Sequence, residues 1–124
     1  MEELRIVIYQ NDPKAAQNLA VSLSQHFDSV QLAGSQEEIR LALTRQRADV
    51  LVLDLETYGP GEVESLHREF PALCIVGTHR LADDELWTEA VNRGASDICE
   101  PHQKDVLRSV LLAASHALSH HAAA

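Results

Sequence analysis

Asp54 is the side chain whose placement best suits chemistry. It follows the apolar run Val50–Leu53, and a loop begins directly after it. A short, continuous, branched apolar run predicts a strand buried on both faces in the middle of a parallel sheet. A carboxylate is costly inside such a core, but not at the strand's carboxyl end, where open α/β sheets place their ligand crevices. We therefore take Asp54 as the candidate functional residue.

Strand and helix patterns alternate five times along the chain, without an internal linker or repeat. Apolar, β-branched runs predict strands at Leu4–Tyr9, Ser29–Gly34, Ala48–Asp54, Leu73–Thr78 and Ser96–Cys99. Apolar residues at helical spacing predict helices over about Pro13–His26, after Ser35, across Val63–Phe70, over Leu81–Asn92 and from His102 to about Ala117. Such alternation predicts a parallel sheet with helices on both faces. The strand ends then bring together Gln10, Asn11, Gly34, Asp54, Thr78 and Glu100.

Composition excludes several classes of protein. With 124 residues and 45% hydrophobic residues, the chain has the size of one domain with one core. A net charge of −9 argues against direct binding to nucleic acid or to an anionic membrane. The sequence has no membrane-spanning apolar run and no signal-peptide layout, so we expect a cytoplasmic protein. The two cysteines and seven histidines lack metal-ligand spacing, which predicts free thiols and solvent-facing imidazoles.

Four features occur in a specific order: the segment Ala48–Asp54, Thr78 at a strand end, Gly94–Ser96, and Pro101 after the last strand. With them, the chain resembles the receiver domains of bacterial response regulators over nearly its whole length. The resemblance implies a flavodoxin-like (βα)5 doubly wound parallel sheet with strand order 2-1-3-4-5. It also implies a receiver domain at residues 1–118, while the small-residue stretch 119–124 has no core signal, which predicts a flexible tail.

In that family, the aspartate that ends the third strand accepts a phosphoryl group from a histidine kinase, which implies this role for Asp54. An acidic pair after the first strand holds Mg²⁺, and a hydroxyl and a lysine bind the phosphoryl oxygens. Thr78 matches the hydroxyl, whose movement is relayed to a partner-binding face made by helix four, strand five and helix five. Such a transfer depends on positioning and on cations that neutralise the phosphoryl oxygens.

Several positions depart from the family pattern. The acidic pair falls on Gln10 and Asn11, and the lysine falls on Glu100 or is lost to a one-residue deletion before Pro101. Ile98 stands at the aromatic switch position. Neutral amides bind Mg²⁺ more weakly than carboxylates, and Glu100 would repel an incoming phosphoryl group. The sequence therefore predicts an atypical pseudo-receiver, in which Mg²⁺-dependent phosphorylation is impaired or absent.

Each candidate residue also has a purely structural explanation. Asp54 can be a hydrogen-bonded strand end, Thr78 can cap the fourth predicted helix, and Asp12 is explained better as the N-cap of the first helix than as a metal ligand. Glu56 can add a carboxylate to a metal site, although solvation in the loop is the simpler interpretation. Trp87, on the fourth predicted helix, is either a half-buried anchor or part of the partner-binding face.

Further expectations concern the loops around the site. Tyr58 takes the place of the proline that the family carries four residues after the acceptor aspartate. Glu100 can pair with Lys104 or Arg80, although a solvent-facing side chain is the simpler interpretation. The resemblance also implies a cis Glu100–Pro101 peptide bond.

Three functions compete at this point. The first is a non-enzymatic signalling module that needs no cofactor and binds a protein partner or a second copy through the face of helix four, strand five and helix five. The second is a true phospho-acceptor receiver, phosphorylated on Asp54 by a histidine kinase, with Mg²⁺ needed only in this case. The third, a flavin or nucleotide binder, lacks the glycine-rich phosphate cradle that such ligands require. The sequence does not identify the partner or the pathway.

Overall fold

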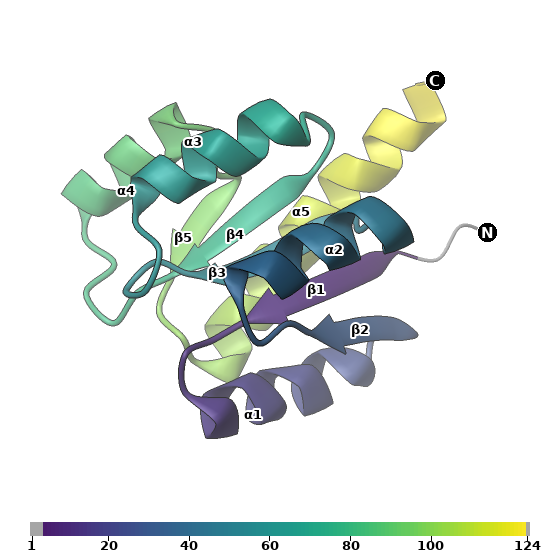
Figure 1. Ribbon diagram of the computed structural model, residues 1–124, viewed down its shortest axis with the longest axis horizontal. Coiled ribbons are helices and arrows are strands. Elements are labelled where there is room, and N and C mark those ends of the chain that lie inside the picture. Colours follow the sequence, from purple (N-terminus) through teal and green to yellow (C-terminus); the bar gives the residue numbers. More distant parts are fainter. Residues whose placement is uncertain (1–3, 124) are drawn as a thin grey trace.

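A computed structural model describes residues 4–123 of the protein, with side chains up to residue 115. Strands and helices alternate along the chain (Figure 1). The strands are β1 (Arg5–Tyr9), β2 (Ser29–Leu32), β3 (Val50–Asp54), β4 (Cys74–Thr78) and β5 (Asp97–Cys99). The helices are α1 (Pro13–Ser24), α2 (Gln36–Gln46), α3 (Pro60–Glu69), α4 (Asp84–Asn92) and α5 (Gln103–Ala123). The predicted fivefold alternation is confirmed.

The five strands form one parallel sheet in the order β2-β1-β3-β4-β5, which confirms the predicted doubly wound fold. The register places Ile8 of β1 beside Val52 of β3, and Asp54 of β3 beside Thr78 of β4. Because every strand runs in the same direction, all their carboxyl ends lie at one end of the sheet. We call this the carboxyl end of the sheet, and the opposite one the amino end.

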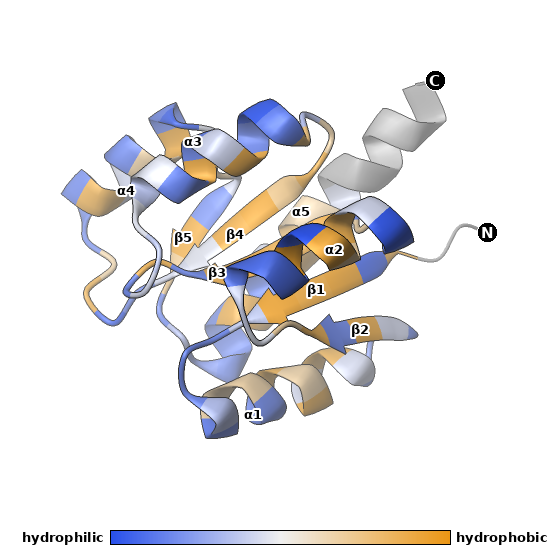
Figure 2. Cartoon of the chain, viewed as in Figure 1, coloured by the Kyte–Doolittle hydropathy of each residue, from blue (hydrophilic) through white to orange (hydrophobic). Residues whose placement is uncertain are grey.

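Successive side chains of a strand point to opposite faces, and here both faces are apolar and covered by helices (Figure 2). Helices α1 and α5 cover one face, where the buried residues include Ile8, Val52, Val76, Leu19 and Val110. Helices α2, α3 and α4 cover the other, where they include Leu51, Leu53, Ile75, Ile39 and Leu66. The sheet therefore lies between two helix layers, and only its ends and side edges are open for polar chemistry.

Side-chain caps fix the beginnings of three helices. Asp12 caps α1, and its Oδ1 accepts a hydrogen bond from the Lys14 backbone N–H over 3.1 Å. Ser35 caps α2 by accepting from the backbone N–H of Glu38, as its capping-box pattern predicts. Asp83 caps α4, so this helix begins after Asp83 and not near Leu81 as the sequence predicts, and the alternative that Thr78 caps it is wrong. The exposed side chain of Leu81 instead precedes the helix.

The last helix and the loop before it also differ from expectation. Helix α5 continues to Ala123, past the predicted end near Ala117. The side chains of the predicted flexible tail at 119–124 lie outside the described residues, so the proposed domain boundary stays a prediction. The described residues contain no cis peptide bond, and the expected cis Glu100–Pro101 bond is therefore wrong. With this bond trans, the Glu100 carbonyl accepts a hydrogen bond from the His102 N–H over 2.8 Å, and the chain turns directly into α5.

Two further findings complete the description of the fold. In the described part of the chain, no helix is long and apolar enough to cross a membrane. Cys74 and Cys99 are free thiols on β4 and β5, as expected, and each is partly buried. Burial raises the pKa of both thiols, in the case of Cys99 to about 11.

Candidate functional site at the carboxyl end of the sheet

Asp54, Thr78 and Gln10 meet at the carboxyl end of the sheet. Asp54 ends β3 and Thr78 ends β4, and the two are register partners. Gln10 directly follows β1, the strand on the other side of β3. All three are nearly enclosed, with exposed fractions of 8% for Asp54, 1% for Thr78 and 9% for Gln10. Parallel pairing thus brings together polar side chains that are far apart in the sequence.

The Asp54 carboxylate accepts three hydrogen bonds. Its Oδ1 accepts from the backbone N–H of Glu56 over 2.9 Å, and its Oδ2 accepts from the backbone N–H of Asn11 over 3.1 Å. The Thr57 hydroxyl also donates to Oδ2, over 3.3 Å. These donors are all neutral, and no described cationic side chain forms an ion pair with Asp54. Backbone and hydroxyl dipoles therefore stabilise the negative charge of this carboxylate.

The side chain of Gln10 is hydrogen-bonded to Thr78 and not to Asp54. Its Nε2 donates to the Thr78 hydroxyl over 2.8 Å. That hydroxyl donates in turn to the carbonyl oxygen of Leu53, over 3.5 Å. Because buried polar groups need hydrogen-bond partners, the two bonds give the Thr78 hydroxyl one donor and one acceptor. Gln10, one of the two residues that replace the acidic pair, thus acts as a hydrogen-bond donor within the site.

Glu56 and Arg80 join the loops that follow β3 and β4. Glu56 Oε1 accepts from Arg80 Nε over 2.8 Å, and Oε2 accepts from the Arg80 backbone N–H over 3.1 Å. Desolvation raises the pKa of Glu56, but the hydrogen bonds and charge of Arg80 outweigh this effect and hold the pKa below its ordinary value. Arg80 therefore pairs with Glu56 and not with Glu100.

Glu100 lies beside the site without a strong partner. Its side chain is half exposed, and its Oε2 is 3.6 Å from His102 Nε2. This agrees with the solvent-facing interpretation of Glu100.

Ile98, in contrast, is a buried core residue that packs over Gly77 of β4. A Cβ added to Gly77 would lie 2.7 Å from Ile98 Cδ1 and 2.6 Å from Leu55 Cδ1. The absence of a side chain at Gly77 thus lets Ile98 and Leu55 pack directly over β4.

The side chains around Asp54 do not fit a typical Mg²⁺ site. Magnesium prefers carboxylate and water oxygens in an octahedron, but Gln10 and Asn11 supply neutral carboxamides. Asp12 caps α1, and Glu56 pairs with Arg80. Among the residues that the structure describes, no three His, Cys, Asp or Glu side chains are grouped so that they could hold a metal ion. This donor set is less charged than a carboxylate-rich Mg²⁺ site.

Trp87 belongs to a second polar cluster, on the face formed by α4, β5 and α5. Its indole Nε1 donates to Asp97 Oδ1 over 3.2 Å, while the Ser109 hydroxyl donates to Asp97 Oδ2 over 2.7 Å. Asp97 thus connects α4 to α5 across β5. The Trp87 side chain is 46% exposed, so it is partly packed and partly open to solvent.

Sequence reasoning missed two of these contacts. The hydrogen bond between Gln10 and Thr78 links side chains at the ends of β1 and β4, and nothing in the local pattern of either segment predicts it. The role of Asp97 was also missed. An acidic residue at the start of a short strand, with the only tryptophan on one neighbouring helix and a serine on the other, is the signal that could have indicated it.

Comparisons with known proteins agree on the fold. No protein-family model matches the sequence, and no curated protein matches it. Among solved structures, the chain is similar to a response regulator from Thermotoga maritima, with a TM-score of 0.82 and 19% identity over 92% of this chain and 99% of the other. The chain is also similar to the N-terminal signal receiver domain of a two-component response regulator from Bacteroides fragilis. The TM-score is 0.81 and the identity 23%, over 91% of this chain and 98% of the other.

A third similar structure is the signal receiver domain of a DNA-binding response regulator from Colwellia psychrerythraea. Its TM-score is 0.78 and its identity 18%, over 89% of this chain and 95% of the other. At these identities the agreement concerns the backbone, and it extends over nearly the full length of each chain. The strand order, the five helices and these similarities together lead to one conclusion: the protein has the receiver-domain fold of the response regulators.

Proposed function

We propose that the protein is a cytoplasmic signal-transduction receiver domain of the two-component type, non-enzymatic, which acts through protein–protein contacts. We further propose that Mg²⁺-dependent phosphorylation of Asp54 is impaired or absent. The observation that carries this proposal is the set of three neutral hydrogen-bond donors on Asp54, with carboxamides at the two positions that follow β1.

The physical reason is the charge balance of phosphoryl transfer. A carboxylate and an incoming phosphoryl group repel each other unless cations neutralise the phosphoryl oxygens. At this site Gln10 and Asn11 carry no charge, Arg80 is paired with Glu56, and Glu100 adds a negative charge nearby. The electrostatic stabilisation that normally lowers the barrier to phosphoryl transfer is therefore weakened.

The alternative is a functional acceptor that a histidine kinase phosphorylates on Asp54. One observation favours it: Asp54 and Thr78 occupy register-paired strand ends, side by side, as acceptor and hydroxyl must be. In this case Mg²⁺ would be required, and Asp54 would be its one carboxylate ligand from the strand ends.

Titration with beryllofluoride and Mg²⁺ distinguishes the two functions. Amide NMR spectra and Trp87 fluorescence should be recorded for the wild type and for Asp54→Asn. The proposal expects no saturable change in either signal up to millimolar concentrations. A saturable change in the wild type that is lost in Asp54→Asn would contradict the proposal and support the alternative.

A gain-of-function variant tests whether the missing charges are the reason for the impaired phosphorylation. The triple variant Gln10→Asp, Asn11→Asp, Glu100→Lys restores the charges that the family pattern carries at these positions. We expect it to bind Mg²⁺ and to show a saturable response to beryllofluoride, while the same variant with Asp54→Asn stays silent. If the folded triple variant does not respond, the missing charges are not the cause.

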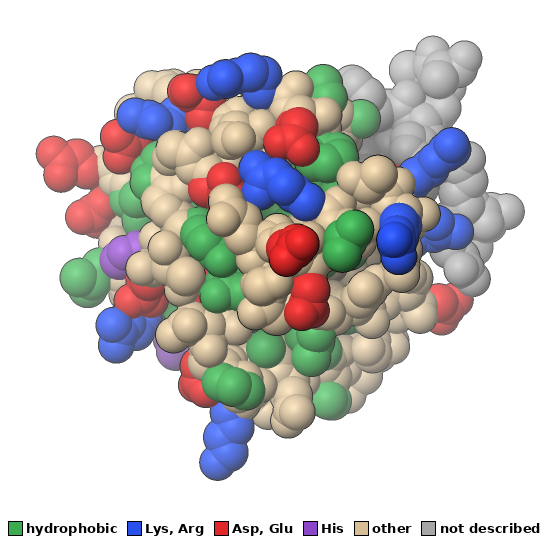
Figure 3. Space-filling model, viewed as in Figure 1, with side chains coloured by type: hydrophobic (Ala, Val, Ile, Leu, Met, Phe, Trp, Pro, Cys, Tyr) green, Lys and Arg blue, Asp and Glu red, His purple; other side chains and the backbone are tan. Residues whose placement is uncertain are grey.

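We also propose that a protein partner or a second copy docks on the face formed by α4, β5 and α5. Trp87 of α4 and Leu112 of α5 are exposed on this face, with exposed fractions of 46% and 60%, and Leu81, in the loop before α4, is 74% exposed. Figure 3 shows acidic side chains gathered at the α4 end of the molecule, where the chain carries Asp83, Asp84, Glu85 and Glu89. Apolar residues beside acidic ones favour a partner with apolar and basic side chains, including a histidine kinase.

The oligomeric state tests the second-copy form of this proposal. Light scattering over a concentration series should be compared for the wild type, Leu112→Glu and Leu41→Glu. Leu41 is a matched control because it is an exposed leucine on α2, away from this face. A dimer that Leu112→Glu abolishes and Leu41→Glu retains supports a second copy. A monomer throughout would contradict the second-copy form.

A further inference from the structure

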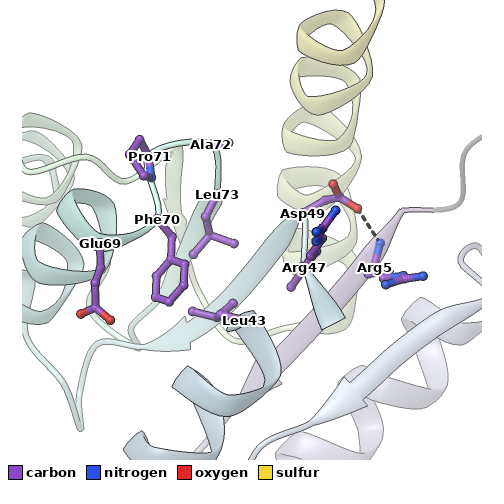
Figure 4. Close-up of a pocket in the computed structure, with 10 residues that line it drawn as sticks. Arg5, Leu43, Arg47, Asp49, Glu69, Phe70, Pro71, Ala72 and Leu73 are labelled. Atoms are coloured by element: carbon purple, nitrogen blue, oxygen red, sulfur yellow. Dashed lines mark hydrogen bonds between the residues drawn. The ribbon is translucent and has the colours of Figure 1, made fainter. Parts of the chain in front are cut away.

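A hollow of about 870 Å³ lies at the amino end of the sheet, away from Asp54. It is an open hollow, lined by the C-terminal part of α2, the residues just before β3, the loop between α3 and β4, and Arg5 at the start of β1 (Figure 4). Pockets that hold small molecules commonly have volumes of about 300–1,000 Å³. The hollow thus has the size of a ligand site and is separate from the candidate site described above.

One side of the hollow is apolar. The side chains of Leu43, Phe70 and Leu73 converge there (Figure 4). Leu43 and Leu73 are buried in the core, and Phe70 is partly buried against it. Because these side chains are anchored by the core, they form a fixed surface on which a flat apolar ring can pack.

The other side carries charged side chains, most of which have partners. Arg5 donates through Nη1 to the carbonyl oxygen of Gln46 over 2.6 Å. Asp49 Oδ2 accepts from the backbone N–H of Arg5 over 2.9 Å. Glu69 pairs with Arg40, outside the hollow, over 3.3 Å. Three of the four charged residues that line the hollow, Arg5, Asp49 and Glu69, therefore have hydrogen-bond or ion-pair partners.

Arg47 is the exception among the charged residues that line the hollow. Its side chain forms no ion pair or hydrogen bond with the described residues, and Arg47 is exposed where it lines the hollow. Its backbone has φ 50° and ψ 56°, and it is the one described residue other than glycine with a positive φ. Glycine is the residue that favours this C-cap conformation, so Arg47 is unfavourable for the fold at this position.

We propose that this hollow binds a small aromatic carboxylate. The ring packs on Leu43, Phe70 and Leu73, and the carboxylate receives hydrogen bonds from the Arg47 guanidinium. The planar fork of arginine suits a carboxylate, and an apolar surface next to one unpaired cation matches an apolar anion. The carboxylates of Asp49 and Glu69, which also line the hollow, disfavour ligands with more than one negative charge. This binding does not depend on the state of Asp54.

Titration with 2-naphthoate, followed by amide NMR, tests the proposal. We expect saturable shifts confined to residues that line the hollow. The neutral analogue 2-naphthalenemethanol should bind at least about tenfold more weakly, because it lacks the charge-assisted contact. Shifts scattered over the whole surface, no saturable shifts, or equal affinity for both compounds would overturn the proposal.

Arg47→Gly separates binding from folding. Glycine suits the left-handed backbone, so the variant should unfold at a higher urea concentration than the wild type. Its Kd for 2-naphthoate should nevertheless rise at least about tenfold. Arg93→Gln, which removes an equal charge on the surface near α4, should leave the Kd unchanged. An unchanged Kd in Arg47→Gly would show that the arginine does not bind the carboxylate and would overturn the proposal.

Discussion

The side-chain amide of Gln10 donates a hydrogen bond to the hydroxyl of Thr78 over 2.8 Å and so connects the ends of β1 and β4 across β3. Both residues are almost completely buried. Removing only one partner of such a buried hydrogen bond is costly, because the polar group that remains cannot form a hydrogen bond with water instead. The contact thus holds the candidate site in one arrangement.

Thr78→Val tests this contact. Valine keeps the shape of threonine but leaves Gln10 Nε2 without its acceptor, so we expect unfolding to become easier by about 1–3 kcal/mol in urea denaturation. The double variant Gln10→Leu, Thr78→Val removes both polar groups and should recover most of this loss. A double variant as unstable as the sum of its single variants would contradict the coupling.

Asp97→Asn tests the link between α4 and α5. The substitution replaces the carboxylate whose two oxygens accept hydrogen bonds from Trp87 and Ser109. The NH2 group of the asparagine then faces one of these donors and cannot accept its hydrogen bond. We expect a loss of about 1–2 kcal/mol in the free energy of unfolding, together with a shift in Trp87 emission. Asp105→Asn is the control: its carboxylate pairs with the exposed Arg108, and its loss should cost less than about 1 kcal/mol. Unchanged Trp87 emission in Asp97→Asn would argue against the link.

Cys99 should react slowly with alkylating reagents in the folded protein. Desolvation raises the pKa of its thiol from 9.0 to about 11, so little thiolate exists at pH 8. Iodoacetamide should modify it at least about 100-fold more slowly than an ordinary exposed thiol, measured by mass spectrometry in a Cys74→Ala background. The rate should rise about tenfold for each pH unit up to about pH 11.

The same shift predicts a loss of stability in alkaline solution. The unfolded chain loses the Cys99 proton at a lower pH than the folded chain does, so this contribution is complete below about pH 9 and declines toward about pH 11. In urea denaturation, the stability of the wild type relative to Cys99→Val should therefore fall across that range. If the free energies of unfolding of the two proteins changed equally with pH, this would contradict the raised pKa of Cys99.

Gly94→Ala should destabilise the contact between α3 and the end of α4. Gly94 has φ 119°, and an added Cβ would collide with the ring of His67. We expect a loss of more than about 1 kcal/mol in thermal or urea unfolding, since alanine adopts this backbone conformation poorly. Adding His67→Ala removes the collision but not the backbone strain, so it should recover only part of the loss. Complete recovery would mean that the backbone conformation costs nothing.

Most of the fold could be predicted from the sequence because its signals are local. The apolar run before Asp54 indicates a central strand, and the side chains of Asp12 and Ser35 cap their helices as their sequence patterns indicate. The five alternating patterns then limit the arrangement to a parallel sheet with helices on both faces. Asp54 and Thr78 met as predicted, since strand ends in such a sheet must lie together.

The contacts between side chains could not be predicted in the same way. Arg80 pairs with Glu56 in the loop after β3, a choice that depends on how two loops approach in space. The hollow beside Arg47 forms where three segments meet, and each segment alone has an ordinary pattern. The error at Leu81 had a different cause: apolar spacing placed the helix start too early, whereas Asp83 supplies the cap.

The placement of α5 has a consequence for synthesis on the ribosome. Val106 and Val110 of this last helix cover the same sheet face as Ile8 and Val52, which are made much earlier. Until α5 leaves the exit tunnel, that face is covered only by α1, and apolar strand residues remain exposed to water or to chaperones. We therefore expect this face of the sheet to become fully packed only after α5 has emerged from the tunnel.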